Sequence, residues 1–89
     1  AMEEVENALT AFSEALNRRQ SLLYAVESAN RAVILARDLF TAGLADFSNV
    51  LDAQKSLLSF QNELAASDGA VTSNLVRLYK ALGGGWETV

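Results

Sequence analysis

The sequence predicts an all-α fold, an antiparallel two-helix coiled-coil hairpin that forms a single domain. The 89-residue chain contains no proline, few glycines, and apolar residues that recur every three or four positions. Residues 3–41 and 47–82 are almost free of helix breakers, with Gly69 as the one exception. Each of these two stretches is therefore expected to form one long helix.

Residues 3–41 carry a continuous line of positions that alternate between spacings of four and three residues. This line consists of Val5, Leu9, Phe12, Leu16, Arg19, Leu23, Val26, Asn30, Val33, Arg37 and Phe40. The corresponding line in residues 47–82 consists of Phe47, Val50, Gln54, Leu57, Gln61, Leu64, Asp68, Val71, Leu75, Leu78 and Leu82. Because a heptad spacing keeps one face of a helix against its partner, these two lines are expected to pack together with a left-handed supercoil.

The segment between the helices, residues 42–46, has the residues of a tight helix ending and restart. Gly43 suits the left-handed position that follows a helix, and Leu44 would then contact Leu39. Asp46 is expected to cap the next helix by accepting a hydrogen bond from the backbone N–H of residue 48 or 49. A turn this short makes the helices antiparallel neighbours, and the glycines at 83–85 are expected to end the second helix in a tail, 83–89.

In an antiparallel hairpin, facing residues have numbers with a constant sum, and this rule places Arg19 opposite Asp68 and Phe40 opposite Phe47. Arg19 and Asp68 are oppositely charged and face each other within otherwise mostly uncharged lines. We interpret them as an ion pair that sets the register of the two helices. The alternative is that the two side chains extend separately into water.

A second line on the first helix is rich in alanine. Its members are Ala8, Ala11, Ala15, Arg18, Leu22, Ala25, Ala29, Ala32, Ala36 and Leu39. If the first line packs within the hairpin, this alanine line stays uncovered and must meet other helices of the same protein or of neighbouring copies. The alternative is that alanine is common here only because it favours helix formation.

Composition excludes several functions. The chain has no Cys and no His and a net charge of −4, so thiol or imidazole catalysis, the usual zinc ligand sets and nucleic-acid binding are not expected. No nucleophile, base and oxyanion donor come together in the pattern, so we expect neither an enzyme nor a cofactor. The apolar run Ala32–Ala36 is far shorter than the roughly 20 residues that span a bilayer as a helix.

Two segments carry a resemblance to a known family: LARDLFTAGLADFSNVLDAQKSLL at residues 35–58 and LVRLYKALGGGW at residues 75–86. Over residues 3–86, the chain resembles the C-terminal half of outer-membrane efflux channels of the TolC and OprM type. The resemblance implies a periplasmic hairpin in the helical barrel of a trimeric outer-membrane protein. It also implies partners: other copies of the chain, a periplasmic adaptor protein of a tripartite pump, and exported small molecules.

The resemblance further implies roles for individual residues. Ala42, Gly43 and Leu44 would contact the adaptor at the periplasmic tip, and positions 49 and 52 would line the tunnel entrance. Asp52 keeps the carboxylate that is frequent there, whereas Asn49 departs from it. Leu44 can equally serve only the helix ending, and Asp52 can be a plain surface charge. The alternative function is a self-contained antiparallel coiled-coil scaffold or interaction module without a transport role.

Overall fold

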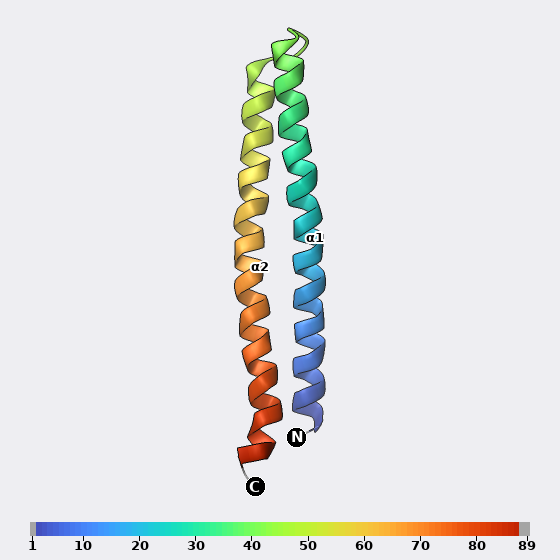
Figure 1. The fold of residues 1–89 in the computed structure, drawn as a ribbon, viewed down its shortest axis with the longest axis vertical. Coiled ribbons are helices and arrows are strands. Elements are labelled where there is room, and N and C mark those ends of the chain that lie inside the picture. The colour runs from blue at the N-terminus through green and yellow to red at the C-terminus, as the bar shows by residue number, and fades with distance from the viewer. Residues whose placement is uncertain (1, 88–89) are drawn as a thin grey trace. The chain divides into compact units, whose positions relative to one another are not determined.

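The structure, a computed structural model, describes the backbone of residues 2–87 and the side-chain surroundings up to residue 83. It contains two helices, α1 (Met2–Thr41) and α2 (Phe47–Glu87), and no strand within the described residues (Figure 1). The predicted all-α helical hairpin is therefore confirmed. The two helices leave residues 42–46 as the turn between them.

The chain divides into two compact units, which we describe separately. The turn unit, Ser21–Ala65, holds the second half of α1, the turn and the first part of α2. The terminal unit combines Ala1–Gln20 with Ala66–Val89. Within each unit, the α1 and α2 segments run side by side in opposite directions (Figure 1).

Buried residues in each unit follow a single line along each helix, again with spacings of three and four. In the turn unit the buried members are Leu22, Ala29, Val33, Ala36 and Val50, and the half-buried members of the line are Val26, Ala53, Leu57, Phe60 and Leu64. In the terminal unit they are Ala8, Ala15 and Ser67, with Val5, Phe12, Arg19, Val71, Asn74, Leu78 and Ala81 half-buried. These residues form the seam between the helices in each unit.

The predicted phase of the seam is wrong for both helices. Half of each predicted line is exposed, including Leu9 and Leu16 on α1 and Leu75 and Leu82 on α2, each of which keeps nearly half of its surface accessible. The alanine line is not uncovered as expected, because four of its alanines, Ala8, Ala15, Ala29 and Ala36, are buried. The seam of α1 thus runs between the two predicted lines and takes alternate residues from each.

The sequence pattern permits this change of phase because α1 has apolar residues along several adjacent lines, and small alanines in the centre let the helices approach closely.

The end of α2 also differs from the expectation. The helix continues to Glu87, past the expected end at Leu82. Glycine lowers helix propensity without blocking the helical backbone, and no proline is present to stop it. The last part of the expected tail, residues 88–89, lies outside the described residues.

Candidate functional site

The turn between the helices is closed by a Schellman motif centred on Gly43. This glycine has φ +76°, the left-handed conformation expected from the sequence. The Leu44 N–H donates to the Leu39 carbonyl at 2.8 Å, and the Gly43 N–H donates to the Phe40 carbonyl at 3.0 Å. These are the two hydrogen bonds that define the motif, and they satisfy the carbonyls of Leu39 and Phe40 near the end of α1.

This closed turn presents an apolar side chain at its apex. Leu44 keeps 77% of its surface exposed, more than any other large apolar residue in residues 3–83. Ala42 and Gly43 beside it are also exposed. The three residues expected at a partner contact are therefore accessible together, on a backbone held by hydrogen bonds.

Asp46 caps the start of α2, but through different partners from those expected. Its carboxylate accepts the Phe47 N–H and the Ser48 hydroxyl, each at 3.0 Å. The N–H of Asn49 instead donates to the backbone carbonyl of Asp46 at 3.1 Å. The carboxylate still lies at the N-terminus of α2, where negative charge is favourable.

Two aromatic rings, one near the end of α1 and one at the start of α2, contact each other beside the turn. The centroids of Phe40 and Phe47 lie 5.1 Å apart and their planes are tilted by 55°. This geometry is in the range preferred by interacting aromatic pairs. Because both rings remain nearly half exposed, the pair supports the turn and also adds apolar surface next to Leu44.

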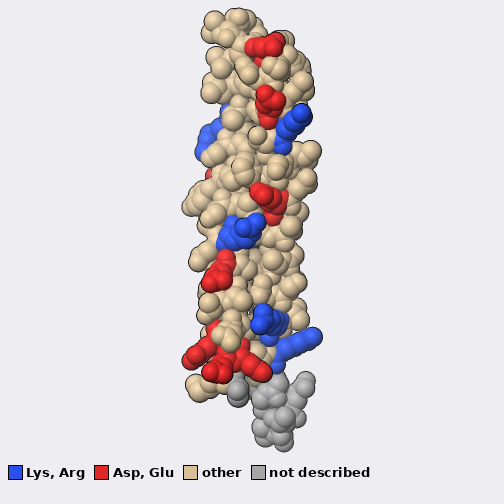
Figure 2. Space-filling view, turned by 180° about the vertical axis from the view of Figure 1, so that it is seen from behind, with Lys and Arg blue, Asp and Glu red and all other residues tan. Residues whose placement is uncertain are grey.

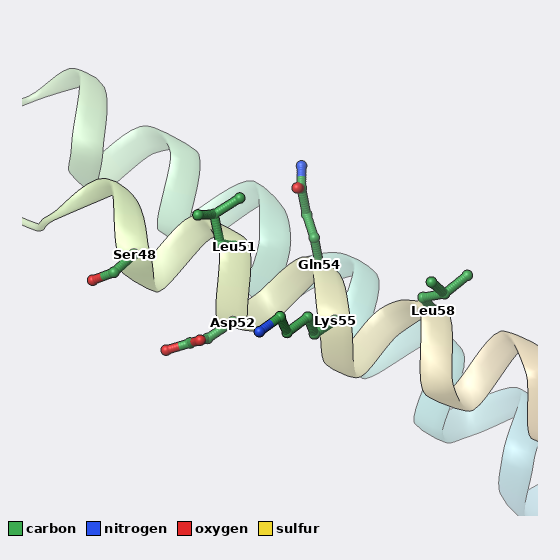
Figure 3. A pocket seen from close by; sticks show the side chains of 6 residues that line it. All are labelled: Ser48, Leu51, Asp52, Gln54, Lys55 and Leu58. Atoms are coloured by element: carbon green, nitrogen blue, oxygen red, sulfur yellow. The ribbon is translucent and has the colours of Figure 1, made fainter.

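The first turns of α2 carry the residues expected at a tunnel entrance. Asn49 and Asp52 are both exposed, and their spacing makes them neighbours on the helix surface. Asp52 also lines a shallow open groove of about 310 Å³ together with Ser48, Leu51, Gln54, Lys55 and Leu58. Figure 3 shows that Ser48 and Asp52 point to one side, whereas Leu51, Gln54 and Leu58 point to the other. The groove therefore has a polar wall and a mainly apolar wall, both from α2.

Arg19 and Asp68 belong to the terminal unit, and they form an ion pair between Arg19 Nε and Asp68 Oδ1. Their side chains are 39% and 51% exposed. The contact therefore sits at the edge of the seam rather than inside it. Charged side chains are otherwise scattered over the face in Figure 2, and acidic ones gather over the N-terminal end of α1, where Glu3 and Glu4 begin the helix.

Sequence reasoning missed two features. Leu51 and Leu58 form the exposed apolar wall of the groove, one helical line away from the predicted seam, and the heptad pattern of that seam hid them. Ser67 is buried in the terminal unit, although it lies outside the predicted line of the second helix. A small polar residue at a spacing of three or four from Leu64 and Val71 was the available signal.

The side chains of the described residues offer no cluster of His, Cys, Asp or Glu that could hold a metal ion. Neither described helix has a stretch long and apolar enough to cross a membrane. The site is a surface of exposed apolar and polar side chains around a hydrogen-bonded turn. Such a surface is suited to contact with another molecule.

Comparison with known proteins identifies the family. The family model described as "Outer membrane efflux protein" matches residues 1–84. The chain belongs to this family. Its members are outer-membrane proteins of efflux systems, so the chain is part of an outer-membrane protein.

Three relatives illustrate the similarity. Outer membrane protein OprJ of Pseudomonas aeruginosa is 42% identical over 98% of the chain and 18% of its own length. Cation efflux system protein CusC of Escherichia coli is 33% identical over 96% of the chain and 20% of its own length. Toluene efflux pump outer membrane protein TtgF of Pseudomonas putida is 34% identical over the whole chain and 18% of its own length. The chain thus spans about a fifth of these relatives, and no solved structure matches it.

Proposed function

We propose that this chain is a periplasmic helical hairpin of a trimeric outer-membrane efflux channel. In this role it forms part of the entrance wall of the channel and docks a periplasmic adaptor protein with residues 42–44. The observation that carries the docking role is the exposed Leu44 on a turn that is closed by the two hydrogen bonds of a Schellman motif.

The wall function is supported by the apolar residues that the hairpin leaves accessible. They occur on both helices and include Leu9, Leu16, Ile34, Leu35, Leu51, Leu58, Leu75 and Leu82. Their exposure in an isolated hairpin carries a hydrophobic cost that packing against further helices would remove. A barrel of helices offers each helix two neighbours, and so covers a second apolar face as well as the seam.

A rigid turn supports the docking function. Contact with a preformed surface avoids the entropy cost of ordering a loop on binding. Leu44 supplies an apolar anchor, and Phe40 and Phe47 extend the apolar surface beside it. The small residues Ala42 and Gly43 leave room for a partner to approach the backbone closely.

Asn49 and Asp52 would line the entrance of the channel. Both side chains are exposed on the first turns of α2, close to the proposed docking turn. A ring of Asp52 carboxylates from symmetry-related copies would make the entrance negative. The neutral Asn49 would weaken that field at its own level.

The hairpin serves as a shared structural part of the exit duct rather than as a substrate filter. The names of the relatives refer to cation efflux for CusC and to a toluene efflux pump for TtgF, yet both keep a third of the residues of this chain. Ions and an aromatic hydrocarbon require different binding chemistry. We infer that this segment lets exported small molecules through without selecting among them.

The substitution Leu44→Glu tests the docking function in the whole channel protein. It keeps the turn backbone possible but places a charge on the proposed contact. We expect the variant to form trimers in the outer membrane, to lose most adaptor cross-linking, and to export a fluorescent dye at a strongly reduced rate. Leu44→Met is the matched control, since it keeps an apolar side chain of similar volume and should behave like the parent.

Normal cross-linking and dye export by the Leu44→Glu channel would overturn the docking role and leave Leu44 as a helix-ending residue only. Loss of the trimer from the outer membrane, measured by immunoblotting of membrane fractions, would instead assign Leu44 to folding or assembly. The cross-linking probe should be placed at Ala42, because this exposed residue lies beside Leu44 without being altered in the test.

A further inference from the structure

Residues 66–74 of α2, within the terminal unit, bring few large apolar side chains to the seam. In this stretch the one large apolar side chain is Val71. Three residues face the seam, Ser67, Val71 and Asn74, and two of them are polar. Since apolar burial is the main force that holds a helix on its partner, this stretch is held more weakly than neighbouring turns that carry leucines.

Ser67 adds an unfavourable contact in the same stretch. The residue is 3% exposed, and its hydroxyl has no hydrogen-bond partner among the described residues. A buried hydroxyl without a partner loses its hydrogen bonds to water and gains none in return. Any opening that lets water reach Ser67 Oγ would recover them.

Gly69 weakens the helix itself two residues further along. A glycine inside a helix is disfavoured because the unfolded backbone has more freedom to lose. Apart from the adjoining backbone of the helix, no atom lies within 4 Å of the position that a Cβ would occupy here, so close packing does not require this glycine. The structure therefore gives a reason for conformational freedom at Gly69 and none for tight contact.

Two side chains nearby also donate hydrogen bonds to backbone carbonyls of their own helix. The Thr72 hydroxyl donates to the Asp68 carbonyl at 3.1 Å, and the Asn74 amide donates to the Ala70 carbonyl at 2.8 Å. Hydrogen bonds of this kind, from a side chain to the carbonyl four residues earlier, slightly destabilise and often bend helices. On α1, the seam of the same unit contains Phe12, Ala15 and the half-exposed Arg19, whose ion pair with Asp68 is accessible to water.

We propose that residues 66–74 form a compliant segment, the part of α2 that opens or bends before its neighbouring turns do. Four features in these nine residues each lower the stability of the helix: the Ser67 hydroxyl without a partner, Gly69, and the Thr72 and Asn74 side chains that donate to helix carbonyls. Within the proposed channel wall this segment would let α2 change its curvature. That use rests on the proposed function, whereas the local opening itself does not.

Hydrogen–deuterium exchange of the whole protein, read by mass spectrometry of peptides, tests the compliant segment directly. We expect amides of residues 66–74 to exchange roughly tenfold faster than those of residues 50–60. Gly69→Ala should slow exchange in the segment roughly fivefold, the equivalent of the helix-propensity difference between glycine and alanine. Ser67→Ala should also slow it, because it removes the unsatisfied hydroxyl while changing the volume little.

Gly83→Ala is the matched control. It makes the same change in α2, also at a position with no atom within 4 Å of an added Cβ, but outside the segment. It should leave exchange in residues 66–74 unchanged. Equal exchange of residues 66–74 and 50–60 in the parent protein would overturn the proposal, as would equal effects of Gly69→Ala and Gly83→Ala on the segment. The experiment measures no export, so its outcome is separate from that of the Leu44→Glu test.

Discussion

At the scale of single residues, the backbone angle of Gly43 restricts which residues can replace it, although there is space for a side chain. Its φ of +76° lies in the left-handed region, and no atom lies within 4 Å of the position that an added Cβ would occupy. Substitution is therefore opposed by backbone strain alone. We expect Gly43→Ala to lower the free energy of unfolding by about 1–2 kcal/mol and Gly43→Val to lower it further, as measured by urea unfolding followed by circular dichroism.

Gly43→Asn is the control for this series, since asparagine tolerates the left-handed region better than alanine or valine does. It should cost least of the three. Equal losses for all three substitutions would point to a contact of the glycine itself rather than to its backbone angle.

The Arg19–Asp68 ion pair leads to a second prediction at this scale. Both side chains are exposed by more than a third, so water screens their attraction. We expect a double-mutant cycle with Arg19→Gln and Asp68→Asn to give a coupling energy of about 0.2–1 kcal/mol. A coupling of zero would remove the proposed role of this pair in setting the register.

Residue-level features were predictable where local chemistry decides them. The left-handed Gly43 follows from the need of a helix ending for a residue without a Cβ. The capping partners of Asp46 did not follow, because a carboxylate at the start of a helix can accept from any of several nearby donors. In the structure it accepts from the Phe47 N–H and the Ser48 hydroxyl. Roles in docking or at an entrance depend on a partner, and no property of the side chain alone decides them.

At the scale of the helices, the phase of the seam can be tested with two alanines of α1. Ala29 is buried in the seam, and Ala32 is exposed one turn away. We expect Ala29→Gln to destabilise the hairpin by about 1–3 kcal/mol through overpacking. Ala32→Gln should change stability by less than about 0.5 kcal/mol. Thermal unfolding followed by circular dichroism compares the two, and an effect of equal size would contradict the assigned seam.

The existence of the two helices was predictable from the sequence, but the phase of their contact was not. Periodicity identifies a helix that has an apolar side, and it locates that side only when the apolar stripe is narrow. On α1, neighbouring lines such as Leu9 with Leu16 and Ala8 with Ala15 are both apolar. The choice between them depends on how closely the helices approach, and small residues in the seam permit the closer approach.

At the scale of the whole molecule, the exposed apolar residues predict how the chain behaves when it is purified alone. We expect a strongly helical circular dichroism spectrum and self-association that increases with protein concentration, as measured by sedimentation velocity. The double substitution Leu16→Gln with Leu75→Gln should reduce association, because both leucines are nearly half exposed in the terminal unit.

The matched control replaces two polar residues in the same unit, Ser13→Gln with Ser73→Gln, both at exposed positions. It should associate like the parent chain. A parent chain that stays monomeric and fully helical at every concentration would contradict the expectation that its apolar surfaces need partners.

The short turn of residues 42–46 also determines the order in which this chain can fold. Phe40 and Phe47 meet across a few residues, whereas Arg19 and Asp68 are separated by 49 positions along the chain. Loop-closure entropy rises with the length of chain that must be closed, so contacts beside the turn form first and shorten the loop for the next ones. During folding, helix pairing should thus spread from Gly43 toward both termini.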